Sequence, residues 1–373
     1  MAISNITITW ITPLSFLETD IYIVPEISKH HIIDWHIICS HNESNNYQKE
    51  LNEIKYSFIN IRISLLVFKD AMYSIKTLFR INSYLNSILD KNNLLYVSLC
   101  CFPYFMPLLR LHCDVKKTIV VVHNVITPKG ASSYFLTKIY TYYVLSRFQN
   151  FQTFSTSQYK ALLNKKPNKN IFCSSFALKN YGIPTASLSE SITFLSFGRI
   201  RDYKRIDVLI CAAQKAFKAI NIPFKVKIAG SCKDWEKYQR LIEYPFLFDL
   251  TIREIENKEI PNLFYSSHYF VMPYQDIAQS GSMIVSINYG KPIIASNLES
   301  FRDYVKSDET GFLFQPADVD ELSSIICYVI LNHTLIYPYL CRNIEQLKID
   351  YFSTEKIANN YIAFFNTLLA EKK

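Results

Sequence analysis

Short apolar runs, most of them rich in β-branched residues, alternate with longer helix-like runs along the whole chain. Strands are predicted at residues 6–11, 35–40, 93–99, 117–125, 151–156 and 170–175, and again at 191–198, 224–231, 268–274, 291–297 and 311–316. Helices are predicted at residues 69–90, 132–148, 204–220, 234–242, 282–289 and 318–331. Because a helix between two consecutive strands is typical of a βαβ unit, this alternation predicts parallel sheets and an α/β fold.

Two domains are expected, because 373 residues exceed what one hydrophobic core usually serves. The predicted linker is residues 178–191, LKNYGIPTASLSES, where Gly, Pro and Ser gather between two periodic regions. We therefore predict an N-terminal domain over residues 1–183 and a C-terminal domain over residues 184–350. The last segment, residues 351–373, has the pattern of an amphipathic helix.

Positive charge is concentrated in the first half of the chain. Residues 1–185 hold 19 Lys and Arg against 10 Asp and Glu, whereas residues 186–373 hold 21 against 22. No acidic residue lies between Asp114 and Glu190, and residues 132–154 mix Tyr and Phe with Lys and Arg. Such a surface suits an anionic membrane or a phosphorylated acceptor. A solvated helix with buried aromatic residues is the alternative, and nucleic acid is not an expected partner.

Several other protein classes find no support in the sequence. Neither G-x-G-x-x-G nor G-x-x-x-x-G-K-[ST] occurs, so no glycine-rich nucleotide loop is expected. The nine cysteines form no C-x-x-C, and no His or Cys pair has zinc-ligand spacing, which favours buried thiols in a reducing compartment. The first residues lack the pattern of a signal peptide, and Pro103 and Pro107 interrupt the longest apolar candidate for a membrane span. We expect a soluble, cytoplasmic protein.

Polar residues that directly follow strands are the candidate site, because ligands of open α/β sheets bind beyond the carboxyl ends of the strands. After the strand at 191–198, Gly198 permits a sharp turn, and Arg199 and Lys204 flank a loop that leads into a helix. Two cations beside a helix N-terminus form an anion site, and a diphosphate is the expected guest. Solvated surface charge is the alternative.

A second helix N-terminus is predicted after the strand at 268–274. Ser280 is placed to cap a short apolar helix, Gly281 leaves backbone N–H groups open to a ligand, and Gly290 fits the position just past the helix. Asp318 and Asp320 spell D-x-D. We interpret Asp318 as a helix cap, with Glu321 completing a capping box, and not as a metal ligand.

These segments together carry a family resemblance. FLSFGRIRDYKRIDVLI, FKVKIAGS, QSGSMIVSINYGKPIIASN and ESFRDYVKSDETGFLFQPADVDELSSII follow one another over residues 190–325 as they do in family 4 glycosyltransferases. That family has the GT-B fold, with two doubly wound Rossmann-like domains facing a cleft and a C-terminal helix that crosses back to the first domain. The first half is similar to the family only in general form, through VVVHNV at residues 120–125.

The resemblance implies a retaining transfer of a sugar from a UDP- or GDP-linked donor, without a metal or other cofactor. By analogy, Arg199 and Lys204 bind the donor diphosphate, the turn from Gln279 through Ser280 and Gly281 to Ser282 lies against phosphate or sugar, and His123 faces the transferred sugar. The N-terminal domain would then bind the acceptor, and its excess of positive charge, not the resemblance, predicts that it faces the membrane. The C-terminal domain would bind the nucleotide sugar, and the last helix would pack back on the first domain.

One departure from the family separates this sequence from most members. A Glu, seven residues and a second Glu are usual, whereas the alignable positions here are Ala278 or Gln279, and Ser286. A subset of the family has PY…QSG in place of this signature, and this chain is similar to that subset. Asp276 is the acid nearby, either as a displaced carboxylate or as a turn residue. Lys204-Arg205 also stands where Lys-Gly is more usual.

Three functions are compatible with these features. The first is a hexosyltransferase that builds a cell-surface polysaccharide, such as O-antigen, capsule or exopolysaccharide, on a lipid-linked acceptor at the inner face of the plasma membrane. The second is a catalytically degenerate GT-B protein that binds nucleotide or glycan within a complex. The third is a nucleotide-sugar epimerase or a sugar-binding module with the same architecture.

Overall fold

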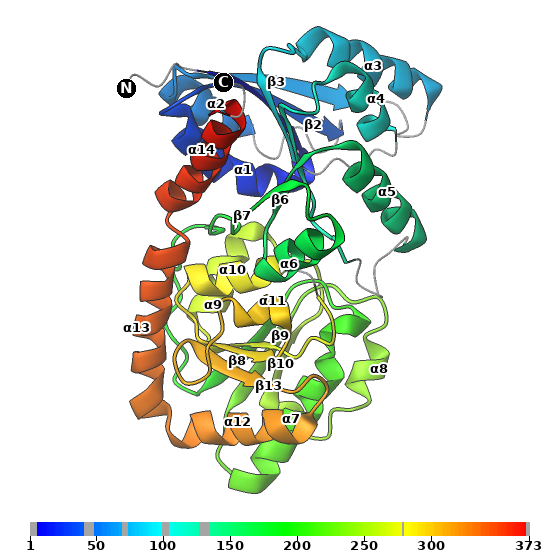
Figure 1. Ribbon diagram of the computed structural model, residues 1–373. Coiled ribbons are helices and arrows are strands. Elements are labelled where there is room, and N and C mark those ends of the chain that lie inside the picture. The colour runs from blue at the N-terminus through cyan, green and yellow to red at the C-terminus, as the bar shows by residue number, and fades with distance from the viewer. Residues whose placement is uncertain are drawn as a thin grey trace. The chain divides into compact units, whose positions relative to one another are not determined.

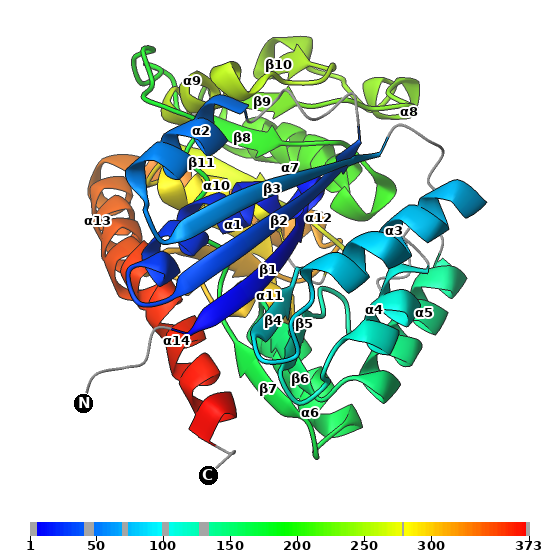
Figure 2. The same ribbon diagram turned by 90° about the horizontal axis from the view of Figure 1, so that it is seen from above.

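The computed structural model describes residues 6–40, 48–68, 74–98, 104–126, 134–277 and 280–370 (Figures 1 and 2). The chain divides into two compact units. The first is formed by the described residues of Met1–Thr127, Ser132–Ala177 and Phe352–Lys373, and the second by those of Leu178–Tyr351. The division therefore lies at Ala177/Leu178 and at Tyr351/Phe352.

The first unit contains a seven-stranded parallel sheet in the order β3-β2-β1-β4-β5-β6-β7. Its strands are β1 (Thr7–Pro13), β2 (Ile32–Ser40), β3 (Ile61–Phe68), β4 (Leu94–Val97), β5 (Thr118–Val121), β6 (Asn150–Thr153) and β7 (Asn170–Cys173). The strand order reverses between β1 and β4, which is the hallmark of a doubly wound sheet.

Helices cover both faces of this sheet. They are α1 (Leu14–Ser28), α2 (Gln48–Ser57), α3 (Ile75–Ile88), α4 (Phe105–His112), α5 (Tyr134–Arg147), α6 (Thr156–Lys165) and α14 (Thr354–Ala370). Buried side chains of α3, α4, α5 and α6 share one core with Ile11 of β1. The neighbouring Trp10 points to the opposite face, where it meets Tyr361 and Phe365 of α14. Since successive residues of a strand face opposite sides, α3–α6 and α14 lie on different faces.

The last helix is part of the first unit, as the family resemblance implies. α14 packs against α1, and Tyr361 is fully buried. Gln152 of β6 donates a hydrogen bond from Nε2 to the Tyr361 hydroxyl at 2.6 Å and accepts one from the Tyr96 hydroxyl. A buried amide with both polar atoms paired fixes α14 on the sheet at little cost in unsatisfied groups.

The second unit contains a six-stranded parallel sheet in the order β10-β9-β8-β11-β12-β13. Its strands are β8 (Thr193–Phe197), β9 (Lys225–Ala229), β10 (Phe248–Thr251), β11 (Tyr269–Met272), β12 (Ile293–Ser296) and β13 (Gly311–Phe314). Its helices and short turns are η1 (Asp202–Lys204), α7 (Ile206–Ile220), α8 (Glu236–Gln239), η2 (Pro245–Leu247), η3 (Asn257–Glu259), α9 (Ile260–Tyr265), α10 (Gly281–Asn288), α11 (Glu299–Arg302), α12 (Val319–Leu331) and α13 (His333–Tyr351). The order reverses between β8 and β11, so a crevice is expected at their carboxyl ends.

The predicted α/β fold with parallel sheets is confirmed, with differences in detail. β3 and β10 were not predicted, because both lie at sheet edges and have exposed residues among their apolar ones. α7 begins at Ile206 and not at Lys204, since a 3-10 turn precedes it. Among the described residues, no single helix meets the length and apolarity needed to cross a membrane. One bent pair, Val319–Leu331 with His333–Ala370, meets them by length and composition alone.

Candidate functional site

The candidate site lies at the carboxyl ends of β8 and β11, where the strand order of the second unit reverses. The loop after β8 contains Gly198, Arg199 and Lys204, and the segment after β11 leads to α10. Because β8 and β11 are neighbours in the sheet, these two loops emerge side by side. The structure therefore brings together two segments that are about eighty residues apart in the sequence.

Two glycines let the chain turn tightly, one after β8 and one after β9. Gly198 has φ of 101° and Gly230, after β9, has φ of 146°, values that other residues rarely adopt. A Cβ at Gly230 would lie 2.3 Å from the carbonyl oxygen of Gly198, a backbone atom that cannot step aside. The close approach of these two loops therefore requires glycine at 230.

Lys204 is buried beside this turn, with 7% of its surface exposed. Its ammonium donates a hydrogen bond to the Phe197 carbonyl at 3.1 Å and lies 5.1 Å from the centre of the Tyr274 ring. A Cβ at Gly198 would be only 3.0 Å from the Lys204 Nζ, so a side chain there would displace the ammonium. The cation is thus held on the inner side of the loop, directly beneath Gly198.

Arg199, unlike Lys204, faces solvent. Its side chain is exposed and its guanidinium forms no hydrogen bond or ion pair with any residue that the structure describes. It lines a depression of about 470 Å³ together with Ile200, Ser231 and Cys232, at the ends of β8 and β9. An exposed guanidinium at the mouth of a depression keeps its donors available to an anion.

Tyr203 and Tyr274 connect the β8 loop to the segment after β11. The two rings meet edge to face with their centres 5.8 Å apart, and the Gln275 N–H donates to the Tyr203 carbonyl at 2.7 Å. The Tyr274 hydroxyl lies 3.3 Å from the Ser282 hydroxyl on the first turn of α10. Tyr274 therefore stands between the Lys204 ammonium and the N-terminus of α10.

The N-terminus of α10 lacks the side-chain cap that the sequence predicts. Ser280 occupies the cap position, but its hydroxyl pairs with the Ser282 hydroxyl at 2.9 Å and accepts no backbone N–H. Among the described residues, no side chain accepts from the first N–H groups of the helix, so these groups can bind another acceptor. Lys179 Nζ lies 3.9 Å from the position of a Cβ at Gly281, which adds a further cation at this end. The predicted end of the helix is confirmed, since Gly290 has φ of 66° just beyond α10.

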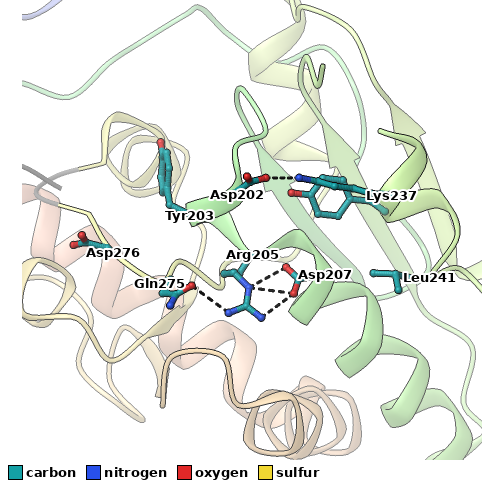
Figure 3. Close-up of a pocket in the computed structure, with 9 residues that line it drawn as sticks. Asp202, Tyr203, Arg205, Asp207, Lys237, Leu241, Gln275 and Asp276 are labelled. Carbon is teal, nitrogen blue, oxygen red and sulfur yellow. Dashed lines mark hydrogen bonds and ion pairs between the residues drawn. The ribbon is translucent and has the colours of Figure 1, made fainter. Parts of the chain in front are cut away.

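Arg205 bridges the start of α7 and the segment after β11, as Figure 3 shows. Its guanidinium binds both carboxylate oxygens of Asp207, with 2.8 Å in the shortest contact, and reaches Gln275 Oε1 at 3.3 Å. The pair with Asp207 raises the pKa of Arg205 further. These groups and Asp276 line an open depression of about 640 Å³. An ion pair between Asp202 and Lys237 borders both this depression and that of Arg199.

Of the remaining predicted site residues in the second unit, Ser286 does not join this group, and Gln279 cannot be placed. Ser286 lies on the inner side of α10 with no exposed surface, and its hydroxyl donates to the Lys291 carbonyl at 3.0 Å. Gln279, with Ala278, lies outside the described residues. Tyr203, Tyr274 and Gln275 were not predicted. Gln275 directly follows the predicted strand at 268–274, so the rule applied to Arg199 would have selected it.

His123 belongs to the first unit and follows β5. Its Nδ1 is buried without a hydrogen-bond partner among the described residues, and the rings of Phe16, Phe154 and Phe176 surround it. Burial in this apolar surrounding lowers the pKa of His123 to about 4, so the imidazole is neutral at pH 7. A buried nitrogen that is left unpaired costs free energy.

The D-x-D segment behaves as a helix cap. The Asp318 carboxylate accepts the N–H groups of Asp320 and Glu321 at 2.9 and 2.8 Å. The predicted capping box is wrong in one respect, because Glu321 accepts from the Gln315 N–H and not from Asp318. No cluster of three or more His, Cys, Asp or Glu side chains suited to a metal is found in the described part of the chain.

Two parallel-sheet α/β units define the architecture of GT-B glycosyltransferases, and solved structures agree. A glycosyltransferase from Rickettsia africae is 13% identical, with a TM-score of 0.71 over 98% of this chain and 99% of that one. Anabaena HepE, in complex with UDP and glucose, is 12% identical, with a TM-score of 0.70 over 97% and 100%. TarM is 19% identical, with a TM-score of 0.63 over 77% of this chain, and the match spans 57% of the TarM chain.

Residues 184–340 match the family model described as "Glycosyl transferases group 1", which covers most of the second unit. The predicted resemblance to a GT-B glycosyltransferase family is thereby confirmed over this segment. The narrower assignment to a PY…QSG subset stays a prediction. No curated protein sequence matches the chain.

Proposed function

We propose that the chain is a glycosyltransferase whose second unit holds the diphosphate of a nucleotide sugar between the Gly198 loop and the N-terminus of α10. One observation carries the proposal: a buried ammonium, that of Lys204, is fixed beneath Gly198 and joined through Tyr274 to the uncapped end of a helix. Fixed cations and free N–H groups on two sides of one position suit a doubly charged group.

The proposed chemistry is a retaining transfer in which the bond between the anomeric carbon and the diphosphate oxygen breaks. The electron pair goes to that oxygen, and the Lys204 ammonium, the Arg199 guanidinium and the α10 N–H groups stabilise the charge that develops. The acceptor oxygen forms the new bond on the same face of the sugar, and its proton passes to the departing phosphate oxygen. No metal is needed in this scheme, because the protein's own cations neutralise the leaving group.

UDP is the nucleotide that we propose first, since complexes of HepE and of S. aureus TarM contain UDP; GDP is the alternative. The proposed acceptor is a lipid-linked saccharide of a cell-surface polysaccharide, which would place the enzyme in the cytoplasm at the inner face of the plasma membrane. The basic first half of the chain supports this acceptor. His123, neutral at pH 7, is the residue of the first unit that we expect to contact the transferred sugar.

The proposal is tested first by donor binding. Thermal shifts with UDP-, GDP- and ADP-sugars should show stabilisation by one nucleotide class, about 2.7 kcal/mol at a hundredfold excess over the dissociation constant. Arg199→Ala should abolish the shift while Arg240→Ala, an exposed cation on the same unit, should leave it intact. Absence of stabilisation by every nucleotide sugar would contradict the proposal.

Transfer is tested next, with radiolabelled donor and membranes. A labelled lipid should form with wild type and not with Arg199→Ala. His123→Ala should retain donor binding and lose transfer, because we assign it to the sugar and not to the diphosphate. Interconversion of the free nucleotide sugar with its epimer, in the absence of an acceptor, would instead identify an epimerase.

A second candidate function is nucleotide binding without catalysis. The buried Ser286 favours it, because that position offers neither a carboxylate nor an exposed hydroxyl to a donor ribose. Nucleotide binding equal to that of active relatives, with no turnover of any donor in the presence of membranes, would select this function over the first.

A further inference from the structure

One layer of helices in the first unit is devoid of acidic residues. α3, α4, α5 and α6 cover the same face of the seven-stranded sheet, and Figures 1 and 2 both show α3, α4 and α5 along one side of this unit. None of the four helices contains Asp or Glu. All seven of their Lys and Arg side chains are exposed: Lys76, Arg80, Arg110, Lys138, Arg147, Lys160 and Lys165.

The same outer surface carries large apolar side chains that face solvent. The exposed fractions run from 40% to 75% for Ile75, Phe79, Leu111, Phe135, Leu136, Ile139, Tyr142 and Leu163. Four of the eight belong to α5. Single exposed apolar residues are common on any protein, but a group of this size on adjacent helices marks an interaction surface.

α5 shows how the surface arises. Val144 and Leu145 are buried in the core that the four helices share with the sheet. Phe135, Ile139 and Tyr142 recur at intervals of four and three residues, so they form a stripe on the outer side of the same helix. Lys166, just after α6, places its ammonium 5.9 Å from the Tyr142 ring centre. α5 is thus apolar on both sides, whereas an ordinary surface helix is polar on its outer side.

We propose that the outer surface of α3–α6 docks on an anionic lipid bilayer, with the apolar side chains of α5 entering the interface and the seven cations contacting lipid phosphates. Exposed aromatic and aliphatic side chains among cations, with no acid, are what such an interface selects. This proposal deepens the membrane location proposed above, because it names the surface that docks. It does not depend on the transfer reaction, because no step of docking involves the donor.

Charge decides between the occupants that this surface could accept. A second copy of the chain would bring cations against cations across a self-complementary interface, which is unfavourable. The described surface of the second unit provides the contrast. α12 and α13 also expose apolar side chains, including Leu335 and Tyr339, but these two helices contain four acidic residues. An anionic bilayer would repel those carboxylates and attract the α3–α6 surface.

Vesicle co-sedimentation of the full chain tests the proposal. Wild type should bind vesicles of phosphatidylcholine and phosphatidylglycerol in equal parts, bind phosphatidylcholine alone at least about tenfold more weakly, and lose most binding at about 0.5 M NaCl. Phe135→Ser/Ile139→Ser and, separately, Lys138→Glu/Arg147→Glu should each lower the partition coefficient about tenfold or more. Leu335→Ser/Tyr339→Ser, a matched apolar loss on α13, should leave it unchanged.

All the substituted side chains are exposed, so these variants should fold like the wild type, which circular dichroism checks. A tryptophan at position 139, introduced as I139W, adds a direct readout: quenching by brominated lipid should occur with anionic vesicles. The proposal is overturned if wild type binds neither vesicle, or if the α13 control loses binding as much as the α5 variant does. It is also overturned if I139W is unquenched, or if the α5 substitutions instead dissolve a dimer or an acidic-protein complex.

Discussion

Replacing Lys204 by Met removes an ammonium while keeping the length and most of the volume of the side chain. Two structural contacts disappear with the charge. The Phe197 carbonyl loses its donor at 3.1 Å, which costs about 1–3 kcal/mol when the group is left unsatisfied, and the contact with the Tyr274 ring is worth roughly 0.5–2 kcal/mol. We therefore expect Lys204→Met to lower the free energy of unfolding by about 2–4 kcal/mol.

Donor binding should suffer separately from stability. A charge-assisted hydrogen bond to the diphosphate is worth about 1.5–3 kcal/mol, so the dissociation constant for UDP should rise roughly 10- to 150-fold. The kcat/KM for transfer should fall further, by the 2–4 kcal/mol typical of one donor aimed at a developing charge. Urea denaturation measures the first quantity, calorimetric titration with UDP the second and the radiolabel assay the third.

Lys225→Met is the matched control. Lys225 also donates from its ammonium to a backbone carbonyl, that of Phe246 at 2.6 Å. It begins β9, however, so it lies at the amino end of the parallel strands, away from the candidate site at their carboxyl ends. Its replacement should cost at most about 1 kcal/mol of stability, because the side chain is exposed, and should leave UDP affinity unchanged. If Lys204→Met loses stability as expected but binds UDP like wild type, Lys204 is a structural lysine and the proposed diphosphate site is wrong.

Three further predictions concern backbone strain and buried charge. Gly230→Ala should abolish donor binding and lower the free energy of unfolding by more than about 3 kcal/mol. Gly182 also has a positive φ but has open space around it, so Gly182→Ala should lower that free energy only by the backbone strain of about 1–2 kcal/mol. Equal losses in the two variants would show that the contact between residue 230 and Gly198 is unimportant. Arg205→Gly should change the free energy of unfolding by less than about 1 kcal/mol, because relief of the left-handed backbone at residue 205 offsets the loss of its partly exposed ion pair with Asp207. A larger loss, measured by chemical denaturation, would show that this ion pair contributes more to stability. Burial raises the pKa of Asp20 to about 6 in the folded chain, so between about pH 4 and 6 the native state binds one more proton than the unfolded state. The free energy of unfolding should therefore fall as pH rises through this window, by about 3 kcal/mol in total. The pH profile of Asp20→Asn should lack this decline.

The titration of His123 also changes stability with pH and must be separated from that of Asp20. Its folded-state pKa of about 4 lies below the unfolded value, so stability is lost as pH falls from about 6.5 toward 4, opposite in sign to the effect of Asp20. The difference between wild type and Asp20→Asn at each pH isolates the aspartate. Its carboxylate accepts hydrogen bonds from Trp10, Thr12 and Ser98, and Asn retains one acceptor at the same place. An unchanged difference across the window would contradict the assigned pKa.

The sequence by itself determined the class of fold and the rough position of the site. Alternating apolar and amphipathic runs predict parallel sheets, because parallel neighbours need a long crossover connection, which is usually a helix. Gly198 with its following cations, and Gly290 beyond α10, were identified from local chain geometry, since a positive φ is a property of the residue and its immediate neighbours. Local rules also explain the failures at β3 and β10, whose pairing depends on strands elsewhere in the chain.

Only the tertiary structure decided which side chains act together. Nothing local to residues 199–205 distinguishes the exposed Arg199 from the buried Lys204; the ring of Tyr274, seventy residues later and one strand over, creates the inner position. Ser286 is buried for the same kind of reason, because one side of α10 faces the sheet. On α5, likewise, the sequence contains apolar residues all round, and contact with the sheet determines which of them remain outside. Burial is a relation between distant segments, so it is settled when they pack and not before.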